Sequence, residues 1–153
     1  MTSIKAVALD VDGVLTDGDF LWGPDGQEWK RFSFRDVMGV SEARRAGLLI
    51  ALISGEDTPI LDRYATKMGI EDIYKGCKDK ANAVLEFASK RGLHLSEIAF
   101  MGDDINDIDA MKLVGLSAAP ADAHASVLAI AKFISGKAGG HGAVRELMDF
   151  VIQ

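Results

Sequence analysis

The feature that most constrains the fold is a short apolar run near the start of the chain that ends in two carboxylates. Residues 6–9 read Ala-Val-Ala-Leu, and Asp10, Val11, Asp12 and Gly13 follow directly. The run is too short for a helix, and the lack of polar alternation is typical of a strand buried on both faces. Such strands belong to parallel sheets, in which ligands bind beyond the carboxyl ends of the strands. The sequence therefore predicts that Asp10 and Asp12 lie where such a sheet places its chemistry.

Apolar runs of strand length alternate with helical stretches along the rest of the chain. Strands are expected at 48–53, 73–74, 98–101, 116–119 and 133–134. Helices are expected from Asp36 to 46, from Thr58 to 68, from Asp79 to 91, after the acidic loop to 114, from about 122, and after 142 to 151. This alternation predicts an α/β fold, a Rossmann-like and mostly parallel sheet with helices on both faces. A length of 153 residues suits one domain over residues 1–153.

Two glycine-rich turns stand out from this pattern. Residues 17–34 carry Trp22 and Trp29 on either side of a Gly-Pro-Asp-Gly turn, which predicts a β-hairpin insertion that projects from the core. Exposed aromatic surface on such a hairpin more often marks an interface than a cofactor site. The second turn, Gly-Gly-His-Gly at 139–142, lies within a C-terminal segment of turn and helix at about 136–153.

Composition excludes several classes of protein. The net charge of −6 argues against a nucleic-acid groove, which depends on clustered Lys and Arg. The apolar runs are too short to span a membrane, and the acidic motif follows the N-terminus too closely for a signal peptide, so we expect a cytoplasmic protein. The single cysteine, Cys77, cannot form an internal disulfide and has no catalytic partner nearby, so we interpret it as structural.

Several polar residues follow the expected strands or open the expected helices, namely Asp10, Asp12, Ser54, Lys80, Asp103 and Asp107. In a parallel sheet these turns fall on the same edge, so the side chains can converge. Carboxylate oxygens suit Mg²⁺, and an ammonium group with hydroxyl and amide donors suits phosphate. Each residue alone also has a simpler explanation. Acids are common at helix N-termini, lysines are commonly exposed on helices, and serine is common in turns. Their joint occurrence favours a phosphate site with a metal ion.

The segments Asp10-Val-Asp12-Gly13-Val-Leu-Thr16-Asp17, Ser54-Gly55, Lys80 and Gly102-Asp103-Asp104-Ile-Asn-Asp107 resemble, in order, the four motifs of the haloacid dehalogenase superfamily of phosphatases. The resemblance implies two-step phosphoryl transfer, with Asp10 as the nucleophile and Asp12 as the general acid and base. It also implies that Mg²⁺ is bound by Asp10, by the backbone carbonyl of Asp12 and by Asp103. The side chain of Asp12 would then remain free to exchange protons.

The same resemblance implies roles for the residues around these groups. Lys80 would offset charge between nucleophile and phosphate, and the phosphate would also be bound by Ser54, Gly55 and Gly13. The residues that support the site from behind would be Asp104, Asp107 and Thr16.

The segments between the motifs are too short to hold the cap domain of many superfamily members. The chain is similar to the capless sugar-acid phosphatases, on the basis of residues 12–17, Phe34-Arg35-Asp36, 53–55, 76–80 and 139–146. This group includes enzymes acting on 3-deoxy-D-manno-octulosonate 8-phosphate and on nine-carbon sialic-type 9-phosphates, in lipopolysaccharide or sialic acid biosynthesis. The resemblance implies a homotetramer in which the hairpins meet at the centre and the C-terminal tail approaches an adjacent site.

One departure from the octulosonate pattern bears directly on the substrate. The octulosonate enzymes usually read Ser-Gly-Arg after the second strand, and this chain has Glu56 at the third position. Glu56 can accept hydrogen bonds from sugar hydroxyls but would repel a substrate carboxylate, so Lys67, Arg35 or Arg145 would have to bind that group. We expect an eight-carbon substrate such as 3-deoxy-D-manno-octulosonate 8-phosphate, with a KDN or N-acylneuraminate 9-phosphate as the alternative.

Two hypotheses in which the protein is not an enzyme compete with the phosphatase hypothesis. A phospho-receiver domain also places aspartates, a Ser or Thr and a Lys at strand ends. Its phospho-acceptor, however, lies on a middle strand where this chain has Ser54, and it has no counterpart of the acidic loop after Lys80. A silent regulatory relative would be expected to have lost catalytic residues, and all of them are present here.

Overall fold

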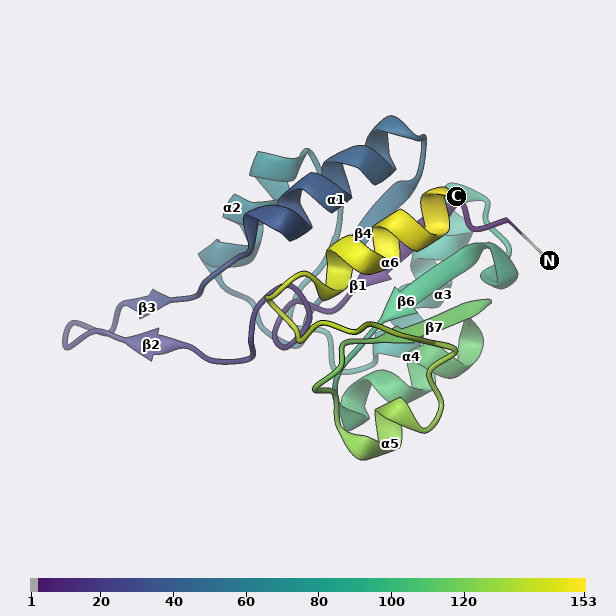
Figure 1. The fold of residues 1–153 in the computed structure, drawn as a ribbon. Coiled ribbons are helices and arrows are strands. Elements are labelled where there is room, and N and C mark those ends of the chain that lie inside the picture. The colour runs from purple at the N-terminus through teal and green to yellow at the C-terminus, as the bar shows by residue number, and fades with distance from the viewer. Residues whose placement is uncertain (1–2) are drawn as a thin grey trace.

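A six-stranded parallel sheet forms the centre of residues 3–153, the part of the chain that the computed structural model describes (Figure 1). Its strands, in the order β5-β4-β1-β6-β7-β8, are Asp72–Tyr74, Leu49–Ile53, Ala6–Leu9, Ile98–Met101, Leu116–Ala119 and Phe133–Ile134. The chain builds outward from β1 on one side and returns to build outward on the other. Such a reversal opens a crevice at the carboxyl ends of the central strands. The end of β1 therefore lies at the centre of the ligand-binding edge.

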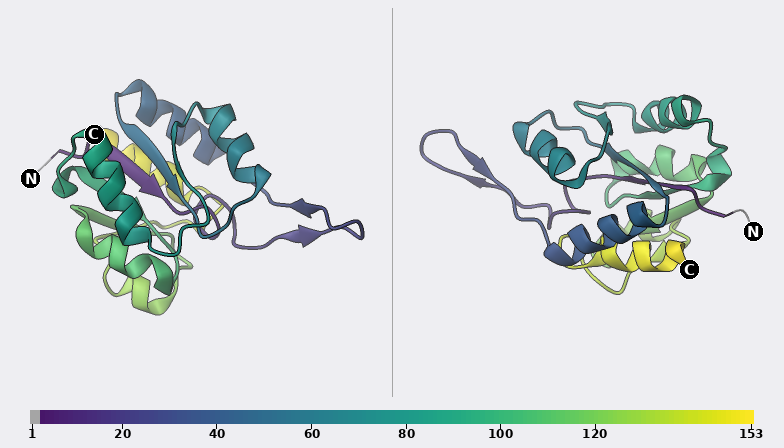
Figure 2. Two further views of the ribbon diagram at one scale, coloured as in Figure 1. Left: turned by 180° about the vertical axis from the view of Figure 1, so that it is seen from behind. Right: turned by 90° about the horizontal axis from the view of Figure 1, so that it is seen from above.

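Helices cover both faces of this sheet, which confirms the expected class (Figures 1 and 2). One face carries α1 (Phe34–Arg45), α2 (Pro59–Met68) and α6 (Ala143–Ile152), and the other carries α3 (Lys80–Arg91), α4 (Ile108–Leu113) and α5 (Ala125–Leu128). Successive residues of a strand point to opposite faces, so in β1 the larger Val7 and Leu9 meet the first layer while Ala6 and Ala8 meet the second. Both faces of the strand are therefore buried from solvent.

Two expected helix starts were wrong. Ser33, and not Asp36, is the N-cap of α1, because the Ser33 Oγ accepts the N–H of Arg35 at 3.2 Å. Asp36 instead lies buried in the first turn, where its Oδ1 accepts the N–H of Arg145 near the start of α6 at 2.9 Å. A carboxylate is favourable at that helix end because it meets unpaired N–H groups. The helix expected from about 122 begins only at Ala125.

The hairpin after β1 projects away from the core, as expected (Figure 2). Its strands β2 (Leu21–Trp22) and β3 (Glu28–Trp29) pair antiparallel in a sheet of their own. Trp22 is 72% exposed and Trp29 is 51% exposed. Within residues 3–153, only this hairpin and α1 separate β1 from β4, and only the 3₁₀ turn η1 (Leu95–Glu97) separates α3 from β6, so neither interval holds a cap domain. No helix in these residues has the length and apolar character needed to cross a membrane.

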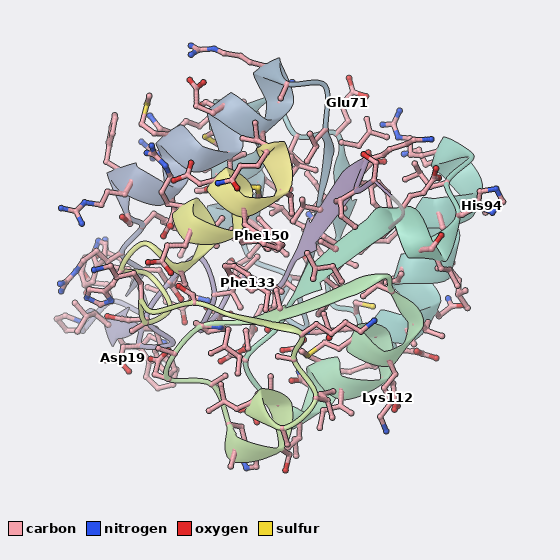
Figure 3. The ribbon with its side chains drawn as sticks, turned by 45° about the vertical axis from the view of Figure 1, so that its right-hand side comes forward. Asp19, Glu71, His94, Lys112, Phe133 and Phe150 are labelled. Carbon is pink, nitrogen blue, oxygen red and sulfur yellow. The ribbon has the colours of Figure 1, made fainter. Side chains whose placement is uncertain are left out.

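The second glycine-rich turn packs directly against the loop that follows β1. A Cβ on Gly139 would lie 1.9 Å from the carbonyl oxygen of Gly13, and the N–H of Gly140 donates to the carbonyl of Val14 at 3.0 Å. Helix α6, which follows this turn, is fixed to the sheet edge by Phe150, whose ring centroid lies 5.0 Å from that of Phe133 in β8 (Figure 3). The C-terminal segment thus supports the loop that carries the first motif.

Candidate active site

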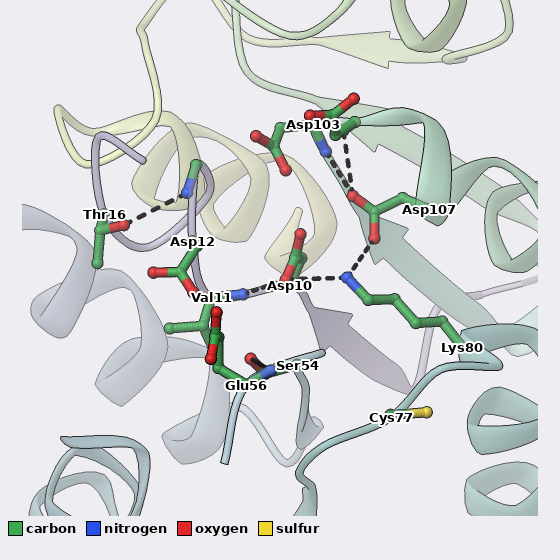
Figure 4. A network of polar contacts seen from close by, with 12 residues as sticks. Asp10, Val11, Asp12, Thr16, Ser54, Glu56, Cys77, Lys80, Asp103 and Asp107 are labelled. Atoms are coloured by element: carbon green, nitrogen blue, oxygen red, sulfur yellow. Dashed lines mark hydrogen bonds and ion pairs between the residues drawn. The ribbon is translucent and has the colours of Figure 1, made fainter. Parts of the chain in front are cut away.

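The carboxyl ends of the central strands bring the predicted residues together (Figure 4). Asp10 follows β1, Ser54 follows β4, Gly102 and Asp103 follow β6, and Lys80 opens α3. Of these residues, Asp10, Ser54 and Asp103 line a pocket of about 370 Å³. Its other lining residues are Asp12, Gly18, Gly55, Glu56, Lys78, Asp104 and Asn106. Residues from four separate segments therefore meet at one edge of the sheet, as the topology predicts.

Lys80 forms the electrostatic centre of the cluster. Its Nζ lies 3.1 Å from Oδ1 of Asp10 and 2.8 Å from Oδ1 of Asp107, and its side chain is only 2% exposed. The other oxygen of Asp107 accepts the N–H groups of Asp103 at 2.9 Å and of Asp104 at 3.2 Å. Asp107 is thus fully committed to holding Lys80 and the backbone of the acidic loop. The supporting role that the family resemblance implies for Asp107 stays a prediction.

The remaining carboxylates carry more negative charge than Lys80 alone can offset. Burial raises the pKa of Asp10 well above its usual range, the carboxylates of Asp107 and Asp103 add to this effect, and Lys80 opposes it. Burial also raises the pKa of Asp103 from 3.8 to about 6, with further repulsion from Asp107 and Asp104. Each shift means that burial and neighbouring negative charges disfavour the ionised form more than its present partners stabilise it. The cluster is therefore suited to a further cation.

The donor set of this cluster fits a divalent metal ion. One carboxylate oxygen each from Asp10, Asp103 and Asp107 lie within 4.8 Å of one another. Because both oxygens of Asp107 already accept hydrogen bonds, Asp10 and Asp103 are the carboxylates better placed to bind the ion. Carboxylate oxygens are the ligands that Mg²⁺ prefers. A contribution from the backbone carbonyl of Asp12 stays a prediction.

Magnesium is expected to stabilise the folded protein more at about pH 7.5 than at about pH 5. Only ionised carboxylates bind a metal well, and Asp103, with a pKa of about 6, is largely protonated at the lower pH. Without metal the pH dependence has the opposite sign. Folded Asp103 keeps its proton to a higher pH than Asp103 in the unfolded chain, so its contribution to metal-free stability falls as pH rises from 3.8 to about 6. Thermal unfolding with and without Mg²⁺ at both pH values measures the effect. Equal increases in Tm would contradict the assignment of Asp103 to the metal.

The side chain of Asp12 has a hydrogen-bond partner that the sequence did not indicate, and its freedom to exchange protons stays a prediction. Its Oδ1 accepts a hydrogen bond from Nζ of Lys30 at 2.7 Å. The Lys30 side chain is 3% exposed, although it comes from the base of a hairpin that is otherwise exposed. Sequence reasoning missed Lys30 because no motif spacing connects a hairpin residue with the end of β1.

The residues predicted to bind phosphate lie in tightly held turns. The Oγ of Ser54 accepts the N–H of Glu56 at 3.0 Å, which fixes the turn after β4. Gly13 has a φ of +85°, and a Cβ there would lie 1.8 Å from Oδ2 of Asp103, so only glycine fits. Thr16 closes this loop, since its Oγ1 accepts the N–H groups of Gly13 at 3.3 Å and Gly18 at 3.2 Å. These contacts shape the loop, and the phosphate contacts themselves stay predictions.

Asp104 has a more local role than Asp107. Its Oδ1 accepts the N–H of Ile105 at 2.7 Å and so begins the short 3₁₀ turn η2 (Ile105–Asp107). The residue is exposed and lines the pocket. Asp104 thus fixes the turn through its carboxylate and also lines the pocket around Asp10.

The predicted specificity residues do not gather around Asp10 in a single chain. Glu56 lines the pocket, but Lys67 lines a separate pocket of about 740 Å³ at the base of the hairpin. Arg35 is exposed on α1, and the Arg145 Nε contacts the carboxylate of Asp149 on the same helix at 3.0 Å. Lys78, which sequence reasoning did not select, lines the pocket instead. Its position beside Asp79 and Lys80 in the third motif was the available signal.

Comparisons with known proteins agree with this geometry. A family model for haloacid dehalogenase-like hydrolases matches residues 49–147. The 3-deoxy-D-manno-octulosonate 8-phosphate phosphatase KdsC of Escherichia coli K12 is 36% identical over 150 residues, which are 98% of this chain and 80% of the relative.

Solved structures show the same fold. The 3-deoxy-D-manno-octulosonate 8-phosphate phosphatase of Moraxella catarrhalis, in complex with a magnesium ion, a phosphate ion and a KDO molecule, superposes with a TM-score of 0.95 at 34% identity, covering 97% of this chain and 86% of that chain. The cobalt-bound phosphatase of Haemophilus influenzae has a TM-score of 0.95 at 36% identity, covering 99% of this chain and 88% of its own. With a matching family model and relatives aligned along almost its whole length, the chain belongs to the haloacid dehalogenase-like hydrolase family.

Proposed function

We propose that the protein is a Mg²⁺-dependent phosphatase that hydrolyses 3-deoxy-D-manno-octulosonate 8-phosphate as a single catalytic domain. The observation that carries this proposal is the cluster of Asp10, Lys80 and Asp103 at the end of β1, in a chain 36% identical to KdsC over 98% of its length. The magnesium, phosphate and KDO in the Moraxella catarrhalis structure support the same ligands here.

The chain's own residues divide the reaction into two steps. A carboxylate oxygen of Asp10 bonds to phosphorus while the bond from phosphorus to the sugar oxygen breaks, and Asp12 donates a proton to that oxygen. A water oxygen then bonds to phosphorus, the bond from phosphorus to Asp10 breaks, and Asp12 takes a proton from the water. Lys80 holds Asp10 in place at 3.1 Å. Bound Mg²⁺ supplies positive charge that stabilises the phosphoryl oxygens.

We also propose that the chain works as a homotetramer assembled through its hairpins. The exposed Phe20, Leu21, Trp22 and Trp29 form an apolar surface of the kind that marks protein contacts. Lys67, Arg35 and Arg145, which do not reach the site of their own chain, would then be available to a neighbouring site. The pocket around Asp10 is open at the edge of the sheet, so a neighbouring subunit would also help to exclude water.

Substrate preference is tested by kcat/KM for eight-carbon and nine-carbon sugar-acid phosphates. We expect the octulosonate 8-phosphate to be preferred over KDN 9-phosphate by roughly tenfold or more, which corresponds to about 1.4 kcal/mol. Glu56→Arg should widen this preference, because it places in the pocket wall the Arg that the octulosonate enzymes usually carry at this position.

Asp57→Arg is the matched control, because Asp57 is an exposed neighbour whose carboxylate lies 3.4 Å from Nζ of Lys75. It should leave the preference unchanged. A wild-type preference for the nine-carbon substrate would transfer the assignment to the alternative, and equal rates on unrelated phosphates would remove the sugar-acid assignment.

A further inference from the structure

We propose that Lys30 is a positioning residue for Asp12, holding its carboxyl group in place for proton transfer; this inference rests on the proposed phosphatase function. The contact is short, 2.7 Å from Nζ to Oδ1, and joins the base of the hairpin to the loop after β1. An ion pair between exposed residues contributes little. This one differs because the Lys30 side chain is 3% exposed, so its ammonium group has given up most of its water.

Lys30 reaches Asp12 from outside the pocket. Asp12 is part of the pocket wall and its side chain is 32% exposed, whereas Lys30 lines the two cavities beside the hairpin and is absent from the wall around Asp10. The amine is therefore placed to act on the carboxyl group and not on the substrate. That arrangement separates Lys30 from Lys80, whose Nζ contacts the nucleophile itself.

The geometry suits an acid and base that changes protonation state during the reaction. Lys30 donates to Oδ1, which is a hydrogen-bond acceptor both in a carboxylate and in the carbonyl of a protonated carboxyl group. The proton can therefore reside on Oδ2 while Lys30 keeps its bond to Oδ1. One contact thus fixes the orientation of the group before and after proton transfer. Fixing a reacting group in a productive orientation is a large contribution to catalysis.

The hairpin in turn fixes Lys30. Oε2 of Glu28 lies 3.9 Å from Nζ of Lys30, and Oε1 of Glu28 accepts the indole N–H of Trp22 at 3.0 Å. Glu28 is thus hydrogen-bonded to Trp22 on the first hairpin strand and lies within ion-pair distance of Lys30, which contacts Asp12. The conformation of the hairpin base therefore sets the position of the acid and base, although the hairpin lies outside the pocket.

The test compares Lys30→Met with the wild type on two phosphomonoesters. An alkyl phosphate such as the octulosonate 8-phosphate needs a proton on its leaving oxygen, whereas p-nitrophenolate leaves without one. Rapid-quench measurement of the first step should show a loss of roughly 10- to 100-fold for the alkyl substrate and a much smaller loss for p-nitrophenyl phosphate. KM should change by less than about threefold, because Lys30 does not line the pocket. Lys30→Arg, which keeps a charged donor, should recover most of the rate.

The controls separate this role from a structural one. Lys75→Met removes a lysine that pairs with the exposed Asp57 and Asp62, and it should behave as the wild type. Trp fluorescence reports the conformation of the hairpin, and gel filtration reports the oligomeric state. If Lys30→Met changes either one, the two substrates are compared with Lys30→Gln instead. Equal losses on both substrates, a change confined to KM, or no loss would overturn the inference. If the wild type hydrolysed neither substrate, the proposed phosphatase function would be wrong, and so would the role of Lys30 that rests on it.

Discussion

Asp10→Asn is expected to lower the turnover of phosphomonoesters by roughly 10⁴-fold or more while leaving the fold intact. The amide cannot attack phosphorus, so no covalent intermediate forms on the side chain. The substitution keeps the shape of the residue and removes one negative charge from a site where burial and the carboxylates of Asp107 and Asp103 raise the pKa of Asp10. Metal-free thermal stability should therefore stay equal or rise. Phosphate release and circular dichroism on the same preparation measure both effects.

Asp109→Asn is the matched control for this substitution. Asp109 is an exposed acid in the first turn of α4, close in sequence to the fourth motif but absent from the pocket wall. Its loss should change turnover by less than about twofold, as for a surface substitution. If Asp10→Asn kept more than about one part in a hundred of wild-type turnover, the assignment of Asp10 as nucleophile would be wrong, since loss of a nucleophile costs orders of magnitude more.

Lys80→Met should both destabilise the protein and disable the site. Removing one partner of a buried ion pair leaves the other charge uncompensated, at a cost of about 3–5 kcal/mol, and here Asp10 and Asp107 both lose their ammonium partner. Turnover should fall by roughly 10²–10³-fold, because Lys80 no longer offsets charge next to the nucleophile. Urea unfolding with and without Mg²⁺ measures the first effect, and Mg²⁺ should restore part of the lost stability.

The loss of stability caused by Lys80→Met should depend on pH in a defined direction. Burial opposes the charged form of Lys80, but Asp10 and Asp107 outweigh it and raise the pKa of Lys80 above its ordinary value of 10.5. The stabilising contribution of Lys80 is therefore fully present below about 10.5 and is lost only as pH rises through the higher folded value. Lys112→Met, an exposed lysine on α4, provides the control. A difference that disappeared at neutral pH would show that the buried pair does not stabilise the fold.

The central layer of the fold could be predicted because its signals are local. Apolar runs without alternation, such as 98–101, become strands, and caps and stops such as Asp79 and Gly92 mark helix ends with side-chain and backbone chemistry inside a few residues. The catalytic cluster followed from the topology, because the ends of parallel strands share one edge. The topology therefore predicts that Asp10 and Lys80, 70 residues apart in the sequence, lie together, and their side chains are 3.1 Å apart.

Contacts that depend on how distant elements pack could not be predicted in this way. The local sequence predicts that Asp36 caps its own helix, but its carboxylate accepts the N–H of Arg145, 109 residues away, because α1 and α6 lie side by side. Lys30 was overlooked for the same reason, since its contact with Asp12 requires the hairpin base to fold back over the loop after β1. Short-range patterns carry no information on such packing.

The close packing of Gly139 against Gly13 has a practical consequence for protein engineering. Inserting a reporter domain or an epitope into the turn at 139–142 would force apart backbone segments that leave no room for even one methyl group, and it would displace the loop bearing Asp12. The turn at Gly92 is a better insertion site, because an added Cβ there meets nothing within 4 Å. It follows the C-terminal end of α3, whereas Lys80 lies at the N-terminal end.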